Sequence, residues 1–445
     1  MSKLVAEHVF KVFGRRPKAA VRRIQEGTDR AELREEGTTA AVVDASFEVQ
    51  QGEIFVVMGL SGSGKSTLLR MLNGLAEPTS GRVLFDGQDL TALSPKALRD
   101  LRSQRISMVF QHFALFPHRS VLENAGYGLE VQGVPRKERE EKAAHALDLV
   151  GLAGWGVHWP DELSGGMQQR VGLARALATD ADVLLMDESF SALDPLIRRD
   201  MQDQLLELQQ RLHKTIVFIT HDLNEAMRLG DRIAVMRDGR IVQIGSAEDI
   251  LVDPANDYVA SFVQDVDRSR VLTAGSIMQE PRVMVHPGDG PRAAMRALRT
   301  DQASAAFVVA PGRKLVGTVT EEKVTEALRG GESRVRDLME TECVTTHADA
   351  PLAELLTPAS QTKLPLAVVD GDGRLSGVIP RVTLLAALGD QPETVVGLHH
   401  ALVAEPAGPD SPDGPDGHGT AAGSGDTGLL TKGDTSALTK EAGDA

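Results

Sequence analysis

The 445 residues exceed the length at which a single hydrophobic core keeps growing, so the sequence indicates at least two folded domains. The net charge of −15 argues against a nucleic-acid partner, although ten acidic and two basic residues from Gly389 onward carry about half of it. The apolar runs are far shorter than the roughly 18 to 20 residues of a membrane-spanning helix, and the N-terminus has no pattern of an export signal. We therefore expect a cytoplasmic protein, in which the single Cys343 is a small buried residue without chemistry of its own.

The first region, residues 1–265, alternates short Val- and Ile-rich runs with helical patterns, which predicts an α/β domain with a largely parallel sheet. The expected strands are Ile54 to Met58, Val183 to Met186, Thr215 to Ile219 and Arg232 to Met236. Longer helical patterns from about 96 to 177 predict a helical subdomain. Between Phe13 and Ala41, a basic run followed by an acidic one predicts a surface insertion with one or two helical turns.

A P-loop pattern directly follows the first of these strands and opens a helical pattern. Its glycines let successive backbone N–H groups point at phosphate oxygens, while the lysine reaches the β and γ phosphates of ATP. A glycine-rich turn without a ligand is the weaker alternative, because a Lys-Ser pair ends the pattern. The residues predicted to bind ATP here are Gly59, Ser61, Gly62, Ser63, Gly64, Lys65, Ser66 and Thr67.

Two further strands end in polar residues that suit nucleotide hydrolysis. Asp187 and Glu188 follow one apolar run, and His221 follows the next. Ligand sites lie at the carboxyl edge of such sheets, so we expect these side chains near the phosphates. Asp187 and the hydroxyl of Ser66 are predicted ligands of Mg²⁺, and Glu188 is the predicted base that polarises the attacking water. His221 is predicted to contact the γ phosphate, with a structural histidine as the alternative.

The segment Leu163-Ser-Gly-Gly-Met-Gln-Gln-Arg170 resembles the signature of ABC ATPases, and the other motifs of that family follow in order between about Leu4 and Phe262. The resemblance implies that two copies sandwich two ATP molecules, with the signature of one copy completing the site of the other. It also implies an ATPase that hydrolyses ATP to ADP and phosphate. The residues that it adds to the predicted site are Gln111, at the γ phosphate and Mg²⁺, and Ser164, Gly165, Gly166 and Asp194 at the nucleotide.

More narrowly, the first region resembles the ATPase subunits of glycine betaine and proline importers, on the segments that begin at Gly52, Phe190 and Pro254. This class implies a homodimer at the cytoplasmic face of the membrane, with permease subunits and a substrate-binding protein as partners. It also implies that Phe13 stacks on adenine, where a core phenylalanine is the ordinary alternative. An importer for another solute and a soluble ABC ATPase that acts on nucleic acid stay open as alternatives.

The second region contains a repeat of about sixty residues, at 271–330 and 331–389. The paired repeat resembles tandem CBS domains, which are α+β units, and this implies a regulatory or dimerising role. Nucleotide-binding members have a hydroxyl residue after their Gly-Val-Val turn. The first repeat keeps Thr320, but the second has Pro380 there, which argues against adenosine binding.

The first repeat contains a predicted helix from Pro291 to Arg299 with an arginine stripe. Arg292, Arg296 and Arg299 share one face, and an ordinary solvated surface is as good an explanation as contact with anionic lipid. The last stretch, residues 390–445, is rich in Gly, Pro, Ala, Ser and Asp and predicts a disordered acidic tail.

Overall fold

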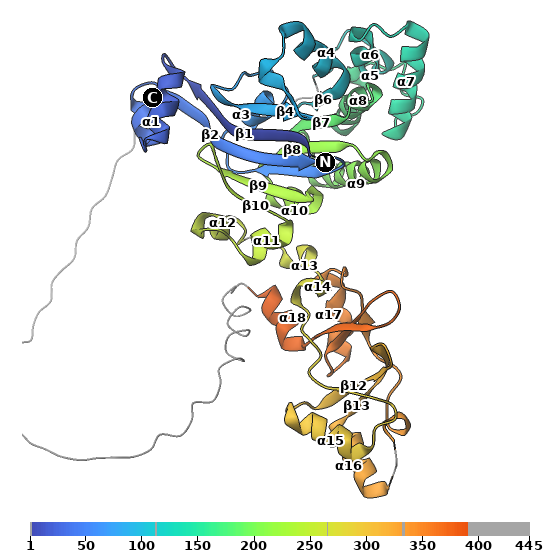
Figure 1. Cartoon of the computed structure of the whole chain (residues 1–445). Helices are drawn as coiled ribbons and strands as arrows, with labels where there is room; N and C mark the ends of the chain where they lie inside the picture. Colours follow the sequence, from blue (N-terminus) through green and yellow to red (C-terminus); the bar gives the residue numbers. More distant parts are fainter. Residues whose placement is uncertain (1, 112–113, 265, 332–333, 390–445) are drawn as a thin grey trace, which may run out of the picture. The chain divides into compact units, whose positions relative to one another are not determined.

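The computed structural model describes residues 2–111, 114–264, 266–331 and 334–389 (Figure 1). The tail predicted at 390–445 lies outside the described residues. Within them, the α/β region with its helical segment and the paired α+β repeats confirm the fold class expected from the sequence. No helix in these ranges combines the length and the apolar character needed to cross a membrane.

A six-stranded sheet forms the centre of the first region, in the order β10-β9-β3-β8-β7-β6. Its strands are β3 (Ile54–Met58), β6 (Ile106–Val109), β7 (Val183–Asp187), β8 (Thr215–Thr220), β9 (Arg232–Arg237) and β10 (Arg240–Gly245). All neighbours are parallel except β10, which pairs with β9 in the antiparallel sense. Every residue of β3 and β8 is buried, because both faces of the sheet are covered.

A second sheet, antiparallel and in the order β2-β1-β4-β5, packs on one face of the first. Its strands are β1 (Ser2–Phe13), β2 (Thr39–Gln50), β4 (Ser80–Phe85) and β5 (Gln88–Asp89). Side chains of β3 alternate between the two faces. Phe55 and Val57 enter the core shared with the second sheet, whereas Val56 and Met58 enter the core shared with the helices.

Helices pack on both faces of the six-stranded sheet, because Leu68 and Leu98 belong to the core shared with the second sheet, whereas Val171 and Met201 belong to the core on the opposite face. The helices are α3 (Lys65–Leu72), α4 (Pro95–Arg105), α5 (Val121–Ala125), α6 (Tyr127–Val131), α7 (Arg136–Leu149), α8 (Gly165–Ala178), α9 (Pro195–Leu212), α10 (Leu223–Leu229), α11 (Ala247–Val252) and α12 (Asp257–Phe262). Helices α4 to α8 gather at one side of this region (Figure 1).

The insertion between β1 and β2 contains more helix than its sequence predicts, namely α1 (Pro17–Gln25) and α2 (Arg30–Glu35). A small core of its own explains the extra helix, because Val21, Ile24 and Leu33 are buried against the ends of the two strands. Asp29 caps α2 by accepting a hydrogen bond from the backbone N–H of Ala31.

The second region contains two three-stranded sheets of the same design, β11-β12-β13 and β14-β15-β16. The strands are β11 (Met284–Val285), β12 (Ala305–Ala310), β13 (Lys314–Thr320), β14 (Thr345–Thr346), β15 (Leu366–Val369) and β16 (Leu375–Ile379). The helices are α13 (Arg268–Val271), α14 (Ala274–Ile277), α15 (Pro291–Thr300), α16 (Glu321–Gly330), α17 (Leu352–Gln361) and α18 (Arg381–Leu388).

The two repeats exchange the segments that precede them. Leu272 and Ile277 are buried in the core of the second repeat, and Val335 and Leu338 are buried in the core of the first. Backbone hydrogen bonds fix the exchange, including one of 2.7 Å from the N–H of Gly275 to the carbonyl of Ala348. The repeats therefore form one unit in which neither core is complete without the other.

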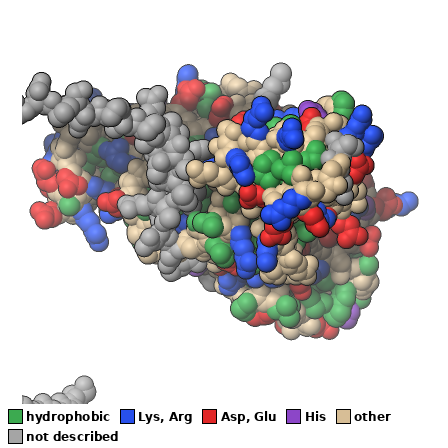
Figure 2. Space-filling view, turned by 90° about the horizontal axis from the view of Figure 1, so that it is seen from below, with side chains coloured by type: hydrophobic (Ala, Val, Ile, Leu, Met, Phe, Trp, Pro, Cys, Tyr) green, Lys and Arg blue, Asp and Glu red, His purple; other side chains and the backbone are tan. Residues whose placement is uncertain are grey.

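Helix α15 forms as expected, with Ala294, Met295 and Leu298 buried and its arginines exposed. Basic and acidic side chains are interspersed over the face seen from below (Figure 2). The sequence predicts that Cys343 is buried, but its side chain is only half-buried. It lies in the loop before β14, where the core does not enclose it, and partial burial still raises the pKa of its thiol.

Candidate active site

The P-loop needs glycine at two close approaches of the backbone. Gly64 lies directly before α3 with a φ of 103°, and a Cβ there would come within 2.2 Å of the carbonyl oxygen of Ala41. At Gly59 the same distance, 2.2 Å, would separate a Cβ from the carbonyl oxygen of Met236. The loop is thus packed so closely against β2 and β9 that only glycine fits. This leaves a backbone cradle of the kind that holds phosphate.

Lys65 begins α3, and its side chain is only 4% exposed. Its Nζ donates to the carbonyl oxygens of Gly59 at 2.8 Å and Leu60 at 3.1 Å, and it lies 3.8 Å from Oε1 of Glu188. Burial lowers the pKa of Lys65, while the negative charges of Glu188 and Asp187 oppose that shift. The structure therefore holds this ammonium group between the loop and the carboxylates at the sheet edge.

Asp187 ends β7 beside the first turn of α3. The hydroxyl of Ser66 donates to Oδ1 of Asp187 at 2.9 Å, and burial raises the pKa of this carboxyl group. Among the described residues, no group of three or more His, Cys, Asp or Glu side chains is placed to hold a metal ion. A pair of oxygens fits Mg²⁺, which commonly takes one or two protein ligands and completes its shell with phosphates and water.

Glu188 and His221 meet at the ends of two neighbouring strands, β7 and β8. Nδ1 of His221 lies 3.0 Å from Oε2 of Glu188, and the backbone of Glu188 has a φ of 45°, which non-glycine residues rarely adopt. The carboxyl group is 19% exposed and the imidazole 53% exposed. Glu188 therefore contacts both the lysine and the histidine while one side of the cluster stays open.

A third connection reaches Glu188 through Ser191, a residue to which the sequence assigned no role. The hydroxyl of Ser191 donates to the carbonyl oxygen of Glu188 at 2.8 Å and accepts from Nε2 of Gln111 at 3.3 Å. Arg198 of α9 donates to the carbonyl oxygen of Ser191 at 3.4 Å and to Asp222, next to His221, at 3.2 Å. The loop after β7 is thus tied to the segment that contains His221.

Other predicted residues lie outside this network. The side chains of Ser164 and Asp194 cap α8 and α9, where they accept from the backbone N–H groups of Met167 at 3.4 Å and Ile197 at 3.0 Å. Phe13 ends β1 with half of its surface exposed, and Nζ of Lys11 lies 5.2 Å from its ring centre. The roles of these residues stay predictions.

Two protein families match the chain. Residues 42–191 match the ABC transporter family, and residues 274–330 and 335–390 match the CBS domain. The first match includes the P-loop, the segment around Ser164, and the Asp187-Glu188 pair. The matches confirm both resemblances that the sequence suggested.

Three curated relatives match along most of their length. The glycine betaine/carnitine transport ATP-binding protein of Listeria monocytogenes is 51% identical over 87% of this chain and 98% of its own length. The glycine betaine transport ATP-binding protein of Bacillus subtilis is 50% identical over 88% of this chain and 94% of its own. The glycine betaine/proline betaine transport ATP-binding protein of Escherichia coli is 47% identical over 87% and 97%. The chain therefore belongs to the ATP-binding subunits of ABC transporters, in the group that includes these three proteins.

Proposed function

We propose that this chain is the motor of an importer for glycine betaine or a related quaternary amine osmoprotectant. As a member of its family the chain is an ATPase, and we infer the substrate class from its relatives, which are glycine betaine transport ATP-binding proteins. The observation that carries the hydrolytic role is the convergence of Lys65, Glu188 and His221 at the carboxyl edge of the sheet.

In this proposal the chain's own residues perform distinct tasks around ATP. Lys65 and the amides of residues 59–67 hold the phosphates, and Glu188 accepts a proton from the attacking water. His221 contacts the γ phosphate while its hydrogen bond orients Glu188. Most of the rate gain comes from positioning and from charge stabilisation, because phosphoryl transfer needs little covalent help from the protein.

Ser66 and Asp187 would hold Mg²⁺, and Gln111 is a further candidate ligand. The metal ion would neutralise charge on the phosphates. The Ser66 hydroxyl already lies against the Asp187 carboxylate at 2.9 Å, so the two oxygens need little rearrangement to share an ion.

Two copies of the chain would complete each site. Ser164, Gly165 and Gly166 start α8, and its free N–H groups suit the γ phosphate of ATP bound to the other copy. Asp194 and Phe13 would contact the nucleotide from the neighbouring loop and from β1. In this arrangement the dimer lies at the cytoplasmic face of the membrane, beneath permease subunits that receive solute from a binding protein.

The CBS module would regulate the motor. We propose that the ATPase domain spans residues 1–265, that the two CBS repeats span 271–330 and 331–389, and that the tail spans 390–445.

The exposed Arg292, Arg296 and Arg299 also line a shallow hollow on α15. Anionic lipid could bind there at about 1 kcal/mol per arginine, an attraction that salt weakens. In this proposal the lipid contact holds the motor inactive at low salt. Replacing all three arginines by glutamine should therefore make the transporter active at low salt in anionic vesicles, and an unchanged salt threshold would exclude this contact.

Transport in reconstituted vesicles tests the proposed function. The chain is assembled with permease subunits and a binding protein from the same organism, and uptake of labelled glycine betaine is measured with internal ATP. We expect uptake that Lys65→Ala abolishes. ATP-dependent uptake of a different solute only would refute the substrate class, and ATP hydrolysis that no permease stimulates would favour a soluble role.

A further inference from the structure

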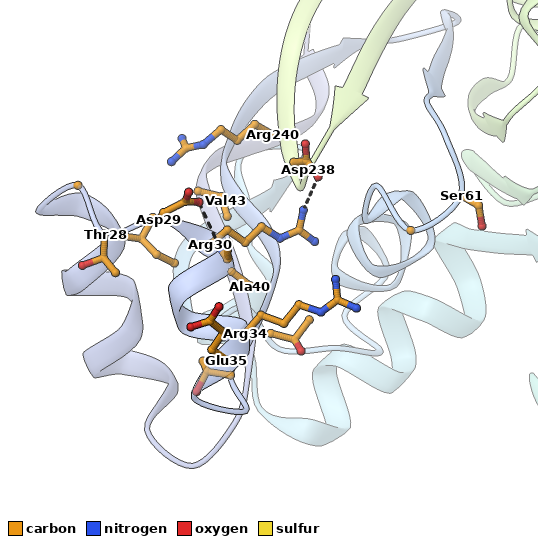
Figure 3. Close-up of a pocket in the computed structure, with 16 residues that line it drawn as sticks. Thr28, Asp29, Arg30, Arg34, Glu35, Ala40, Val43, Ser61, Asp238 and Arg240 are labelled. Carbon is orange, nitrogen blue, oxygen red and sulfur yellow. Dashed lines mark hydrogen bonds and ion pairs between the residues drawn. The ribbon is translucent and has the colours of Figure 1, made fainter. Parts of the chain in front are cut away.

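The α1–α2 insertion faces the P-loop across an open hollow of about 1400 Å³ (Figure 3). Arg30 and Arg34 line it from α2, Ser61 and Gly62 line it from the tip of the P-loop, and Asp238 lines it from the turn between β9 and β10. Neither the predicted site nor the mechanism above assigns a task to the insertion. The hollow is therefore a candidate extension of the nucleotide site.

A chain of polar contacts connects the insertion to the P-loop. Nη1 of Arg30 lies 3.2 Å from Oδ1 of Asp238, as the dashed line in Figure 3 marks. The next residue, Gly239, donates its N–H to the carbonyl oxygen of Ser63 at 3.0 Å and accepts from the N–H of Val43 at 2.8 Å. Arg30 thus anchors α2 to the same turn that supports the P-loop.

Arg34 lies one helical turn after Arg30, so both side chains share a face of α2 and extend into the hollow (Figure 3). Within the described part of the chain, no hydrogen bond or ion pair joins the Arg34 side chain to another residue. Arg23 in α1, by contrast, binds both Glu32 and Glu36. The exposed Arg34 is thus a cation without an anionic partner, held opposite the phosphate loop.

We propose that Arg34 binds the phosphates of the nucleotide held by the P-loop, and that Arg30 is the residue that positions it. The inference rests on the proposed function, because the P-loop supplies the polyphosphate. A guanidinium group presents a planar fork of donors that matches two phosphate oxygens, and such charge-assisted bonds are strong. The insertion is then a cationic clamp on the outer side of the bound nucleotide.

Equilibrium titration of the full-length protein with ADP and with a non-hydrolysable ATP analogue tests the clamp. We expect Arg34→Gln to raise the Kd for the ATP analogue about 10-fold, the loss typical of one charge-assisted bond. Arg34→Lys should fall between Gln and wild type, because an ammonium group cannot bind two oxygens as a fork. Arg30→Gln should raise the Kd less than Arg34→Gln, because Arg30 acts only by holding α2 in place.

Arg22→Gln is the matched control, since Arg22 is exposed on α1 but does not line the hollow. If Lys65→Ala binds nucleotide as tightly as wild type, the proposed function itself is contradicted. If Lys65→Ala weakens binding while Arg34→Gln behaves like Arg22→Gln, the clamp is wrong and the proposed function stands. A loss of nucleotide-induced dimer formation with unchanged nucleotide affinity would assign Arg34 to the partner subunit and also overturn the clamp.

Discussion

Replacing Ser191 by alanine tests whether the loop after β7 holds Glu188 in its working position. The change removes the bond of 2.8 Å to the carbonyl oxygen of Glu188 and the bond of 3.3 Å from Nε2 of Gln111. The backbone N–H of Ser191 still donates to the same carbonyl at 3.2 Å, so the loop keeps one of its ties. Glu188 also has a positive φ that its surroundings must maintain.

Two neutral hydrogen bonds contribute about 0.5–1.5 kcal/mol each, so we expect a loss of about 1–3 kcal/mol. If this loss falls on the transition state, kcat decreases about 5- to 150-fold. KM for ATP should change little, because the contacts of Lys65 and Ser66 are untouched. Steady-state ATPase kinetics of the purified protein measure both parameters.

Two further variants make the result specific. Ser191→Thr keeps the hydroxyl and should restore most of kcat. Ser103→Ala removes a hydroxyl that bonds to the carbonyl oxygen of Asp100 on the surface of α4, and it should leave kcat unchanged. A Ser191→Ala enzyme with wild-type kcat, or one with raised KM and unaltered kcat, would refute the reasoning.

Three other outcomes follow from the structure. Gly64→Ala should cost about 2–5 kcal/mol of folding free energy, because its Cβ meets the carbonyl oxygen of Ala41, whereas Gly62→Ala meets no atom within 4 Å and should cost only backbone strain; thermal unfolding of both variants compares them. Burial raises the pKa of Glu225 above its usual value, so ionisation of this carboxyl group destabilises the fold as the pH rises through the raised pKa. The melting temperature of Glu225→Gln should therefore exceed that of wild type at pH 8 and equal it at pH 4. The same difference in melting temperature at both pH values would contradict the shift. Mixing Ser164→Arg with Lys65→Ala subunits should restore ATP-dependent dimers through one intact composite site, and no recovery would count against the two-copy arrangement.

The sequence predicted the main architecture because its signals are local. Apolar runs located β3, β7, β8 and β9 to within one residue, since strands buried on both faces need continuous Val, Ile and Leu. The P-loop and the two acids at the end of β7 could be assigned because their spacing from a strand determines where they emerge.

The remaining features depend on contacts between distant segments. The internal repeat and its resemblance to CBS domains predict two α+β units, but they do not indicate that Leu272 belongs to the second core and Val335 to the first. The role of Ser191 depends on a loop conformation that brings its hydroxyl back to Glu188. Arg34 has an ordinary surface sequence context, and only the folded insertion places it opposite Ser61.

Glu188→Gln tests the central claim most directly, because glutamine keeps the shape of the side chain but cannot accept the proton of the attacking water. The measurement compares nucleotide affinity and ATP turnover of this variant with those of wild type. We expect an affinity within about twofold of wild type, since Lys65 and Ser66 are unaltered, and a turnover lowered at least about 100-fold. Hydrolysis at the wild-type rate would contradict the assignment of Glu188 as the base of this motor.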